Sequence, residues 1–225
     1  MCGVFGFVSY DGKGPAVGTL QKIATATMSR GPHAFGFAWI DGRNRLHCFK
    51  QSGKIVDSIG LLQLAHDARF LIGHCRYATH GTPSNNLNNH PHPADGGWIV
   101  HNGVIRDYER ICQRNDFFPV SECDSEVLGL LIEEADGSLA ERVKTAVLEA
   151  MDSPLAMLGL WSRPGRMIAV RAGNPLHVGR VKGGERYYLG SLSEGLPGKV
   201  WSVKDGTGLE FTPHGMRKLE LELPV

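Results

Sequence analysis

The chain has 225 residues, enough for one sizeable hydrophobic core, and 42% of them are hydrophobic and 21% charged, as in ordinary globular proteins. Its 24 basic and 23 acidic residues leave a net charge of +1, which gives no electrostatic basis for binding nucleic acid or an anionic membrane. No apolar run approaches the roughly 18 residues of a membrane span, and the N-terminus lacks the pattern of a secretory signal.

The first hundred residues predict strands separated by two helices. Thr19 is expected to cap a helix that ends near residues 31–32, and residues 58–66 are expected to form a short helix. The apolar face of the first helix is predicted to contain Leu20, Ile23, Ala24 and Met28. The predicted strands cover residues 2–8, 35–40, 46–49, 69–75 and 98–101.

A polar stretch from Thr82 to Gly97 separates the last two of these strands, and it contains five Asn or Asp residues and three prolines. A loop of this length inside a compact domain is usually functional or disordered. A helix is expected to begin around residues 121–124 and run to about Ala135. A second helix opens with a capping box formed by Ser138 and Glu141.

The rest of the chain predicts strands over 156–161, 167–171, 176–181, 186–190, 199–203, 208–212 and 217–223. Helices do not alternate regularly with strands, which favours helices packed outside mainly antiparallel sheets. The predicted fold class is therefore α+β. With no internal repeat, low-complexity tract or clear linker, residues 1–225 are interpreted as one domain.

Cys2 directly follows the initiator methionine. If Met1 is removed, Cys2 carries a thiol and a free α-amine, whose reference pKa is roughly 7.7–8.0. The amine can then accept the proton of the thiol, so that one residue supplies both a nucleophile and its base. The alternative is that Cys2 is simply a small residue at the start of a buried strand.

Four other polar positions become informative together. Arg76 follows a predicted strand, Asn102 and Gly103 follow another, and Asp124 lies at the start of a helix. Taken singly, Arg76 would be part of a surface ion pair, Asn102-Gly103 a turn and Asp124 a helix N-cap. Together they suit free glutamine, because Arg76 can bind its carboxylate, Asp124 its ammonium group, and Asn102 with Gly103 the oxyanion formed when Cys2 attacks the amide.

Five motifs occur in order along the chain. They are Cys2-Gly-Val-Phe-Gly6, Gly73-His-Cys-Arg-Tyr-Ala-Thr-His-Gly81, Asn88-Asn-His-Pro-His92, Val100-His-Asn-Gly-Val-Ile105 and Ser121-Glu-Cys-Asp-Ser-Glu-Val127. In these motifs the chain resembles the class II glutamine amidotransferases, members of the N-terminal-nucleophile hydrolase superfamily. The similarity is greatest to the glutaminase domain of glucosamine-6-phosphate synthase. Ser29-Arg-Gly31 and Arg171-Ala-Gly-Asn-Pro-Leu176 also match, so the similarity extends to about residue 213.

This resemblance implies a four-layer αββα sandwich and hydrolysis of L-glutamine through a γ-glutamyl thioester on Cys2. It also implies that Asn102 and Gly103 form the oxyanion hole, and that Arg76 and Asp124 bind the amino-acid head group. Thr79 and His80 match the segment that folds over bound glutamine. Tyr77 stands where synthase-like members have tryptophan and amidophosphoribosyltransferase-like members have tyrosine, so the synthase's loop gating is not carried over.

The resemblance also sets expectations about partners. Family members usually carry an acceptor-binding domain after the glutaminase domain, and no such sequence follows here before Val225. A separate synthase chain is therefore the expected acceptor of the ammonia. The sequence leaves the identity of the acceptor and the formation of a homo-oligomer open.

Three alternatives remain beside the glutaminase. The same site would suit a γ-glutamyl amide other than glutamine. The chain could instead be an inactive binding or regulatory module that has kept the fold. The third is a metal site, because His74, His80, His90, His92 and His101 lie within 28 residues.

The expectation is that the protein needs no metal and no cofactor, since the histidines show no metal-binding spacing on a helix. His90, His92 and His101 are interpreted as a hydrogen-bonding scaffold beside the site. The five cysteines are scattered without a Cys-x-x-Cys pair, which favours the reducing cytoplasm over a disulfide framework. Four of them, Cys48, Cys75, Cys112 and Cys123, are interpreted as packing residues.

Overall fold

Two antiparallel sheets form the centre of the protein in the computed structural model, which describes residues 2–150 and 154–221. One sheet has the strand order β11-β9-β10-β1-β4-β2-β3 and the other β13-β12-β8-β7-β6-β5. The strands of the first are β1 (Gly3–Ser9), β2 (Ala34–Ile40), β3 (Leu46–Ser52), β4 (Phe70–Arg76), β9 (His177–Arg180), β10 (Arg186–Gly190) and β11 (Lys199–Ser202). Those of the second are β5 (His92–Ala94), β6 (Gly97–Asn102), β7 (Leu155–Ser162), β8 (Gly165–Ala172), β12 (Thr207–Thr212) and β13 (Gly215–Glu220).

Alternating side chains explain why each central strand is buried on both faces. In β1, Val4 and Val8 enter the core between the two sheets, whereas Phe5 and Phe7 enter the core beneath the first helix. Strand β7 of the other sheet is built in the same way, since Leu158 faces the core between the sheets and Met157 faces outward. A strand with apolar residues at every position therefore supplies two cores at once.

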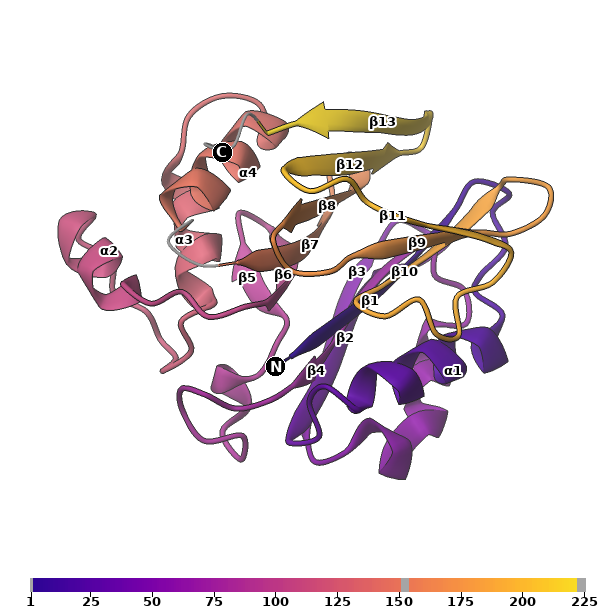
Figure 1. Cartoon of the computed structure of the whole chain (residues 1–225), viewed down its shortest axis with the longest axis horizontal. Coiled ribbons are helices and arrows are strands. Elements are labelled where there is room, and N and C mark those ends of the chain that lie inside the picture. The colour runs from indigo at the N-terminus through magenta and orange to yellow at the C-terminus, as the bar shows by residue number, and fades with distance from the viewer. Residues whose placement is uncertain (1, 151–153, 222–225) are drawn as a thin grey trace.

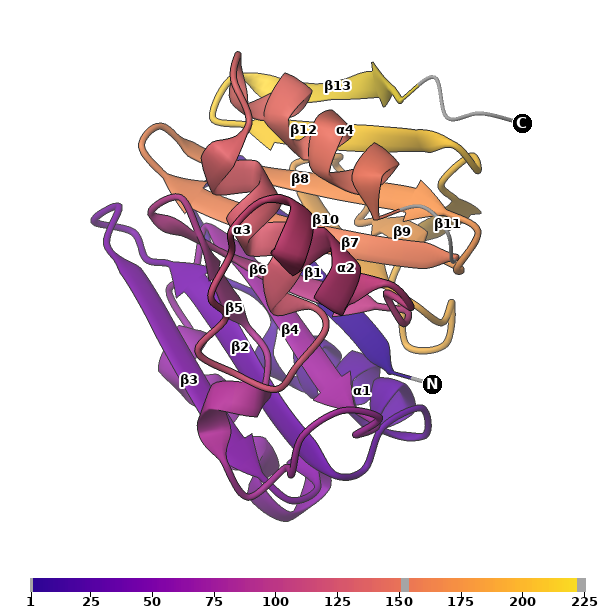
Figure 2. The same ribbon diagram turned by 90° about the vertical axis from the view of Figure 1, so that its left-hand side faces the viewer.

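Helices cover the outer face of each sheet and complete four layers (Figures 1 and 2). The seven-stranded sheet is covered by α1 (Val17–Met28) and the 3₁₀ segment η1 (Ile55–Ala65). The six-stranded sheet is covered by α3 (Glu126–Glu134) and α4 (Leu139–Glu149), which lie across it in Figure 2. The prediction of an α+β fold with a four-layer αββα sandwich is confirmed. In the described part of the chain, no helix is long and apolar enough to cross a membrane.

Several predicted boundaries were right and others were wrong. The capping box of α4 is present, with Ser138 and Glu141 bonded in both directions. Thr19 does not cap α1, which begins at Val17 after Ala16 and has no side-chain cap. The sequence prediction missed α2 (Tyr108–Arg114), because this short helix is mostly polar and buries little beyond Ile111 and Cys112.

The stretch from Thr82 to Gly97 is more ordered than a plain loop. It contains the 3₁₀ turn η2 (Asn86–Asn88) and strand β5, which pairs with β6 at the edge of the sheet. Helix α3 begins at Glu126, so residues 121–124 form the turn before it. The last predicted strand was set at 217–223. Strand β13 ends at Glu220, and residues 222 and 223 lie outside the described residues.

The ends of three strands from the two sheets meet where β1 begins, close to the centre of the view in Figure 1. Strands β1 and β4 pair with Gly3 opposite Cys75, so Cys2 lies beside the end of β4, whose last residue is Arg76. Strand β6 of the other sheet packs against both of them and ends at Asn102. This junction between the sheets brings residues that are a hundred positions apart into one site.

Candidate active site

Cys2 is partly buried against the backbone that follows strand β4. Its Sγ lies 3.3 Å from the backbone nitrogen of Tyr77, which donates to it, and 3.5 Å from the Tyr77 carbonyl oxygen. Burial raises the pKa of the Cys2 thiol above its ordinary value. The thiol is therefore neutral at neutral pH and needs a base before it can act as a nucleophile.

The chain around Cys2 is held by close contacts with the segment after α1. The Arg30 Nε atom donates to the Cys2 carbonyl oxygen at 2.8 Å. A Cβ atom on Gly3 would lie 2.5 Å from the Thr27 side chain, and one on Gly31 would lie 2.3 Å from the Cys75 carbonyl oxygen. The glycines at these two positions let the helix end approach β1 and β4 closely, which fixes the position of Cys2.

A cavity of about 320 Å³ opens beside Cys2. Its size is at the lower end for small-molecule sites. Five of the residues proposed from the sequence line it, namely Cys2, Tyr77, Thr79, Asn102 and Gly103. Val104, Arg106, Pro154 and Asn174 complete the lining and were not proposed from the sequence.

Asn102 ends strand β6 with its side chain fully buried. Among the described residues, neither its Oδ1 nor its Nδ2 has a hydrogen-bond partner. Its carbonyl oxygen accepts a hydrogen bond from Asn174 Nδ2 at 2.8 Å, and the same Nδ2 lies 2.9 Å from the Pro154 carbonyl oxygen. Buried polar atoms are rarely left unpaired, so the amide of Asn102 is available to a molecule bound in the cavity.

Gly103 could not carry a side chain at this position. A Cβ atom there would lie 2.5 Å from His101 Nε2 and 2.7 Å from the Pro154 carbonyl oxygen. Glycine at this position therefore lets the chain pass between the His101 ring and the Pro154 carbonyl at the edge of the cavity.

Arg76 is 2% exposed and does not line the cavity. Its Nη1 donates to Asn89 Oδ1 at 3.0 Å, and its Nη2 donates to the carbonyl oxygens of His80 and Gly81. The guanidinium group therefore holds the turn at 80–81 in place. It also ties that turn to the segment around Asn89.

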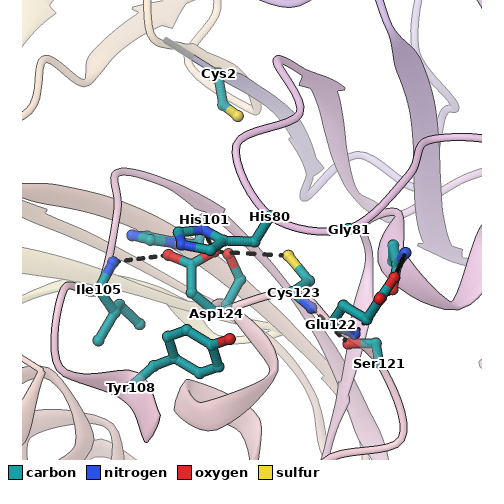
Figure 3. Close-up of polar contacts among 12 residues, drawn as sticks. Cys2, His80, Gly81, His101, Ile105, Tyr108, Ser121, Glu122, Cys123 and Asp124 are labelled. Carbon is teal, nitrogen blue, oxygen red and sulfur yellow. Dashed lines mark hydrogen bonds and ion pairs between the residues drawn. The ribbon is translucent and has the colours of Figure 1, made fainter.

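Asp124 and His80 lie close together, and neither lines the cavity (Figure 3). The Asp124 carboxylate is 3% exposed and accepts a hydrogen bond from the Ile105 backbone nitrogen at 2.7 Å. Its other oxygen lies 3.7 Å from His80 Nδ1. The imidazole of His80 thus lies beside the Asp124 oxygen that does not accept from Ile105.

Tyr77 and Thr79 begin the segment that connects the two parts of the site. The Tyr77 side chain is 45% exposed, and its ring packs on His33 with ring centroids 4.7 Å apart. His33 Nδ1 also accepts a hydrogen bond from the Ala78 backbone nitrogen at 3.0 Å.

Taken together, these contacts divide the predicted site residues into two groups. Cys2, Asn102 and Gly103 lie at an open cavity. Arg76, His80 and Asp124 form a closed cluster beside it.

The buried histidines form only part of the expected hydrogen-bonding scaffold. His101 Nδ1 lies 2.9 Å from the Ser125 hydroxyl, and His74 Nε2 lies 3.0 Å from the His101 carbonyl oxygen. Burial lowers the pKa of His74 to about 3, so this imidazole is neutral. His90 does not fit the expectation, because neither of its ring nitrogens has a partner among the described residues.

Asn174 and Arg106 are the cavity residues that the sequence reasoning missed most clearly. The segment 171–176 was noted as a motif, but no role was assigned to Asn174, whose side chain bridges two chain segments at the cavity. Arg106 lies just after the motif that contains Asn102 and Gly103, and no pattern in the sequence marks it as a cavity residue.

Curated proteins with similar sequences are glutamine–fructose-6-phosphate aminotransferases. The one from Symbiobacterium thermophilum is 32% identical over 96% of this chain and 36% of its own length. The one from Aeropyrum pernix is 37% identical over 81% of this chain and 31% of its own length. The chain thus spans about a third of the length of these relatives. No protein-family model matches the chain.

Solved structures share the fold over the whole chain. The structure described as the allosteric regulatory enzyme of purine biosynthesis has a TM-score of 0.83 at 22% identity, over 100% of this chain and 50% of its own. A glutamine phosphoribosylpyrophosphate amidotransferase from B. subtilis has a TM-score of 0.81 at 23% identity, with the same coverage. A glutamine aminotransferase class-II domain protein from Silicibacter pomeroyi has a TM-score of 0.67 at 14% identity, over 99% of this chain and 100% of its own.

Proposed function

The chain belongs to the class II glutamine amidotransferases, and on this premise we propose that it hydrolyses L-glutamine to glutamate and ammonia with Cys2 as the nucleophile. The observation that carries the proposal is the cavity shared by the Cys2 thiol and the Asn102 amide, which has no hydrogen-bond partner in the part of the chain that the structure describes. A nucleophile and a free donor beside one cavity are the two groups that acyl transfer from an amide requires.

The proposed reaction begins when removal of Met1, which lies outside the described residues, frees the α-amine of Cys2. The amine accepts the thiol proton, and Sγ attacks the side-chain amide carbon of glutamine. The Asn102 side-chain amide and the Gly103 backbone N–H donate to the oxyanion that forms. The proton held by the amine then passes to the leaving nitrogen, and ammonia departs from a γ-glutamyl thioester.

Water completes the cycle. It attacks the thioester carbonyl while the α-amine takes up its proton, and glutamate leaves as the Cys2 thiol is restored. The same pair of donors would stabilise the second oxyanion, because it forms at the same oxygen atom.

Binding of the amino-acid head group requires the cluster of Arg76, His80 and Asp124 beside the cavity to open. We propose that Arg76 takes the carboxylate of glutamine and Asp124 takes its ammonium group. His80 stands beside Asp124, and the carbonyls of residues 80 and 81 accept from Arg76. The segment from Tyr77 to Gly81 must therefore shift as glutamine enters, and Thr79 and His80 then close over it.

The fate of the ammonia is a further part of the proposal. The relatives named above are aminotransferases with fructose 6-phosphate in their names, and about two thirds of their length lies outside the match. We propose that ammonia made at Cys2 is delivered to a synthase unit on a separate chain. A homo-oligomer is compatible with this arrangement, and neither nucleic acid nor a membrane has a role in it.

A substrate panel tests the proposed function directly. Glutamate release, the product common to all three, would be measured with L-glutamine, γ-glutamyl anilides and γ-glutamyl dipeptides at equal concentrations. L-Glutamine is expected to have the highest kcat/KM, because the cavity of about 320 Å³ suits a small amide. Preference for a larger γ-glutamyl amide would replace the glutaminase with the alternative hydrolase, and no turnover of any compound would favour a binding module.

Replacing Asp124 by asparagine is expected to raise the KM for glutamine by about 10- to 100-fold with a smaller change in kcat. A hydrogen bond to a charged group contributes about 1.5–3 kcal/mol, and the neutral amide cannot pair with the ammonium group in the same way. Steady-state kinetics would measure the effect.

Asp107→Asn is the matched control for this variant, since Asp107 is exposed and its side chain makes no capping bond to α2. Its KM should equal that of the parent protein. An unchanged KM in Asp124→Asn would remove Asp124 from the glutamine site.

A further inference from the structure

Two buried histidines and a buried cysteine meet beside the proposed glutamine site. His90 precedes Pro91 in the turn before β5, His92 begins β5, and Cys123 lies in the turn before α3. Each of the three has one potential ligand atom within 4.8 Å of those of the other two. All three side chains are at most 4% exposed.

The imidazoles of this group lack the hydrogen bonds that buried histidines normally make. Within residues 2–150 and 154–221, neither Nδ1 nor Nε2 of His90 has a partner, and Nε2 of His92 has none. A neutral imidazole has one N–H donor and one acceptor nitrogen, so burying both without partners is unfavourable. The His90 ring instead packs on the His74 ring at a centroid distance of 3.9 Å and on the His92 ring at 4.6 Å.

We propose that His90, His92 and Cys123 bind a divalent metal ion of the zinc class. Two imidazole nitrogens and one thiolate are the donor types that zinc prefers. Donor atoms around tetrahedral zinc lie about 3.3–3.7 Å apart, given bond lengths of about 2.0–2.3 Å, so an adjustment of about 1 Å would bring these three into range. A water molecule would fill the remaining position. The His74 ring, which packs on that of His90, has an Nδ1 atom without a partner among the described residues that could bond to this water.

The protonation states of the group suit a metal. Burial lowers the pKa of His90 and His92 well below the ordinary value, so both imidazoles are neutral and have a free lone pair. Burial raises the pKa of the Cys123 thiol to about 12, so metal binding must displace its proton to solvent as the metal–sulfur bond forms. The positive charge of nearby Lys50 opposes the binding of a metal cation. Burial lowers the pKa of this lysine, which favours its neutral form and so weakens the repulsion.

The site would join two segments that hold the residues proposed to bind the glutamine head group. Asn89, next to His90, accepts from Arg76, and Cys123 is next to Asp124 (Figure 3). Reciprocal hydrogen bonds of 2.9 Å between Asn88 and Glu122 already place the two segments side by side. A metal here would be a structural tie, because its ligands are buried. Only this consequence rests on the proposed function; the metal site itself does not.

The test is the metal content of the purified chain, measured by elemental mass spectrometry after dialysis against metal-free buffer. It should be made in a Cys2→Ala background, because a free N-terminal thiol and amine can chelate metals. We expect about one zinc per chain, and at least a tenfold loss in Cys123→Ser and in His92→Asn. Cys112→Ser is the matched control, since Cys112 is a buried thiol in α2 outside the group, and it should retain the metal.

Cobalt titration keeps the test valid if a variant folds poorly. After treatment with a chelator, the protein that retains His90, His92 and Cys123 should be titrated with cobalt. Its thiolate-to-cobalt charge-transfer absorption should saturate at one equivalent of cobalt. Cys123→Ser should lack that band. Less than a tenth of an equivalent of metal after dialysis, together with the absence of the band, would overturn the proposal. Neither readout depends on glutaminase activity, so the proposed function can fail independently.

Discussion

Replacing Cys2 by alanine is expected to reduce glutamine hydrolysis by at least about 10⁴-fold, because the variant has no atom that can form the thioester. Burial raises the pKa of the Cys2 thiol, and among the described residues the hydrogen-bond partners of its Sγ are backbone atoms of Tyr77 rather than a side-chain base. The α-amine of Cys2 is therefore the base on which the account depends. Steady-state release of glutamate would measure the loss.

Two controls separate the chemistry from folding and processing. Intact mass should show that Met1 is absent from both the parent protein and Cys2→Ala. Cys48→Ala removes another partly buried thiol, whose pKa burial raises to about 11, from strand β3 away from the cavity. Its activity should equal that of the parent. Turnover retained by Cys2→Ala would end the assignment of the nucleophile.

Replacing Asn102 by alanine is expected to lower kcat by about 10²–10³-fold while KM changes little. Removal of one oxyanion donor has an effect of this size in other acyl-transfer enzymes, because the donor acts mainly on charge that develops in the transition state. The Asn102 amide is fully buried, lines the cavity and has no partner among the described residues. Loss of this amide should therefore lower kcat strongly and change the free energy of unfolding little.

Asn115→Ala is the comparison for this variant. Asn115 directly follows α2 as its C-cap, and its side-chain amide donates to the Ile111 carbonyl oxygen at 2.9 Å. It does not line the cavity. This variant should retain the kcat of the parent even if its melting temperature falls. A rise in KM with unchanged kcat in Asn102→Ala would instead give Asn102 a role in binding glutamine before the reaction.

Much of the fold could be predicted from periodicity because the central strands are buried on both faces. Continuous apolar runs such as 2–8 and 156–161 have a strand as their simplest interpretation, and both are strands in the structure. Helix α2 could not be found in this way, because its burial depends on tertiary contacts with α3 rather than on a long apolar face. Likewise β5 is a three-residue edge strand, too short for any alternation to be visible.

The candidate site was predictable where its residues belong to motifs and not where tertiary packing alone places them. The sequence grouped Cys2, Asn102 and Gly103, and the structure places all three at one cavity. It could not indicate that Arg76 and Asp124 are closed off by the turn at 80–81, because that depends on the conformation of the loop. Nor could it indicate Asn174, whose position depends on hydrogen bonds across two other segments.

The proximity of Cys123 to His90 and His92 was also not predictable from spacing. About thirty residues separate Cys123 from the two histidines, and the sequence favoured packing as the role of the cysteine. Tertiary structure brings these residues together, through the contact between β5 and α3 and the hydrogen bonds between Asn88 and Glu122.

The most direct measurement of the central claim is the intact mass of the purified chain before and after exposure to an electrophilic glutamine analogue. The account predicts loss of Met1, a single adduct located on Cys2, and protection by excess L-glutamine but not by excess L-leucine. Retained Met1, or an adduct on Cys2 that glutamine does not prevent, would contradict a glutamine site built on an N-terminal nucleophile.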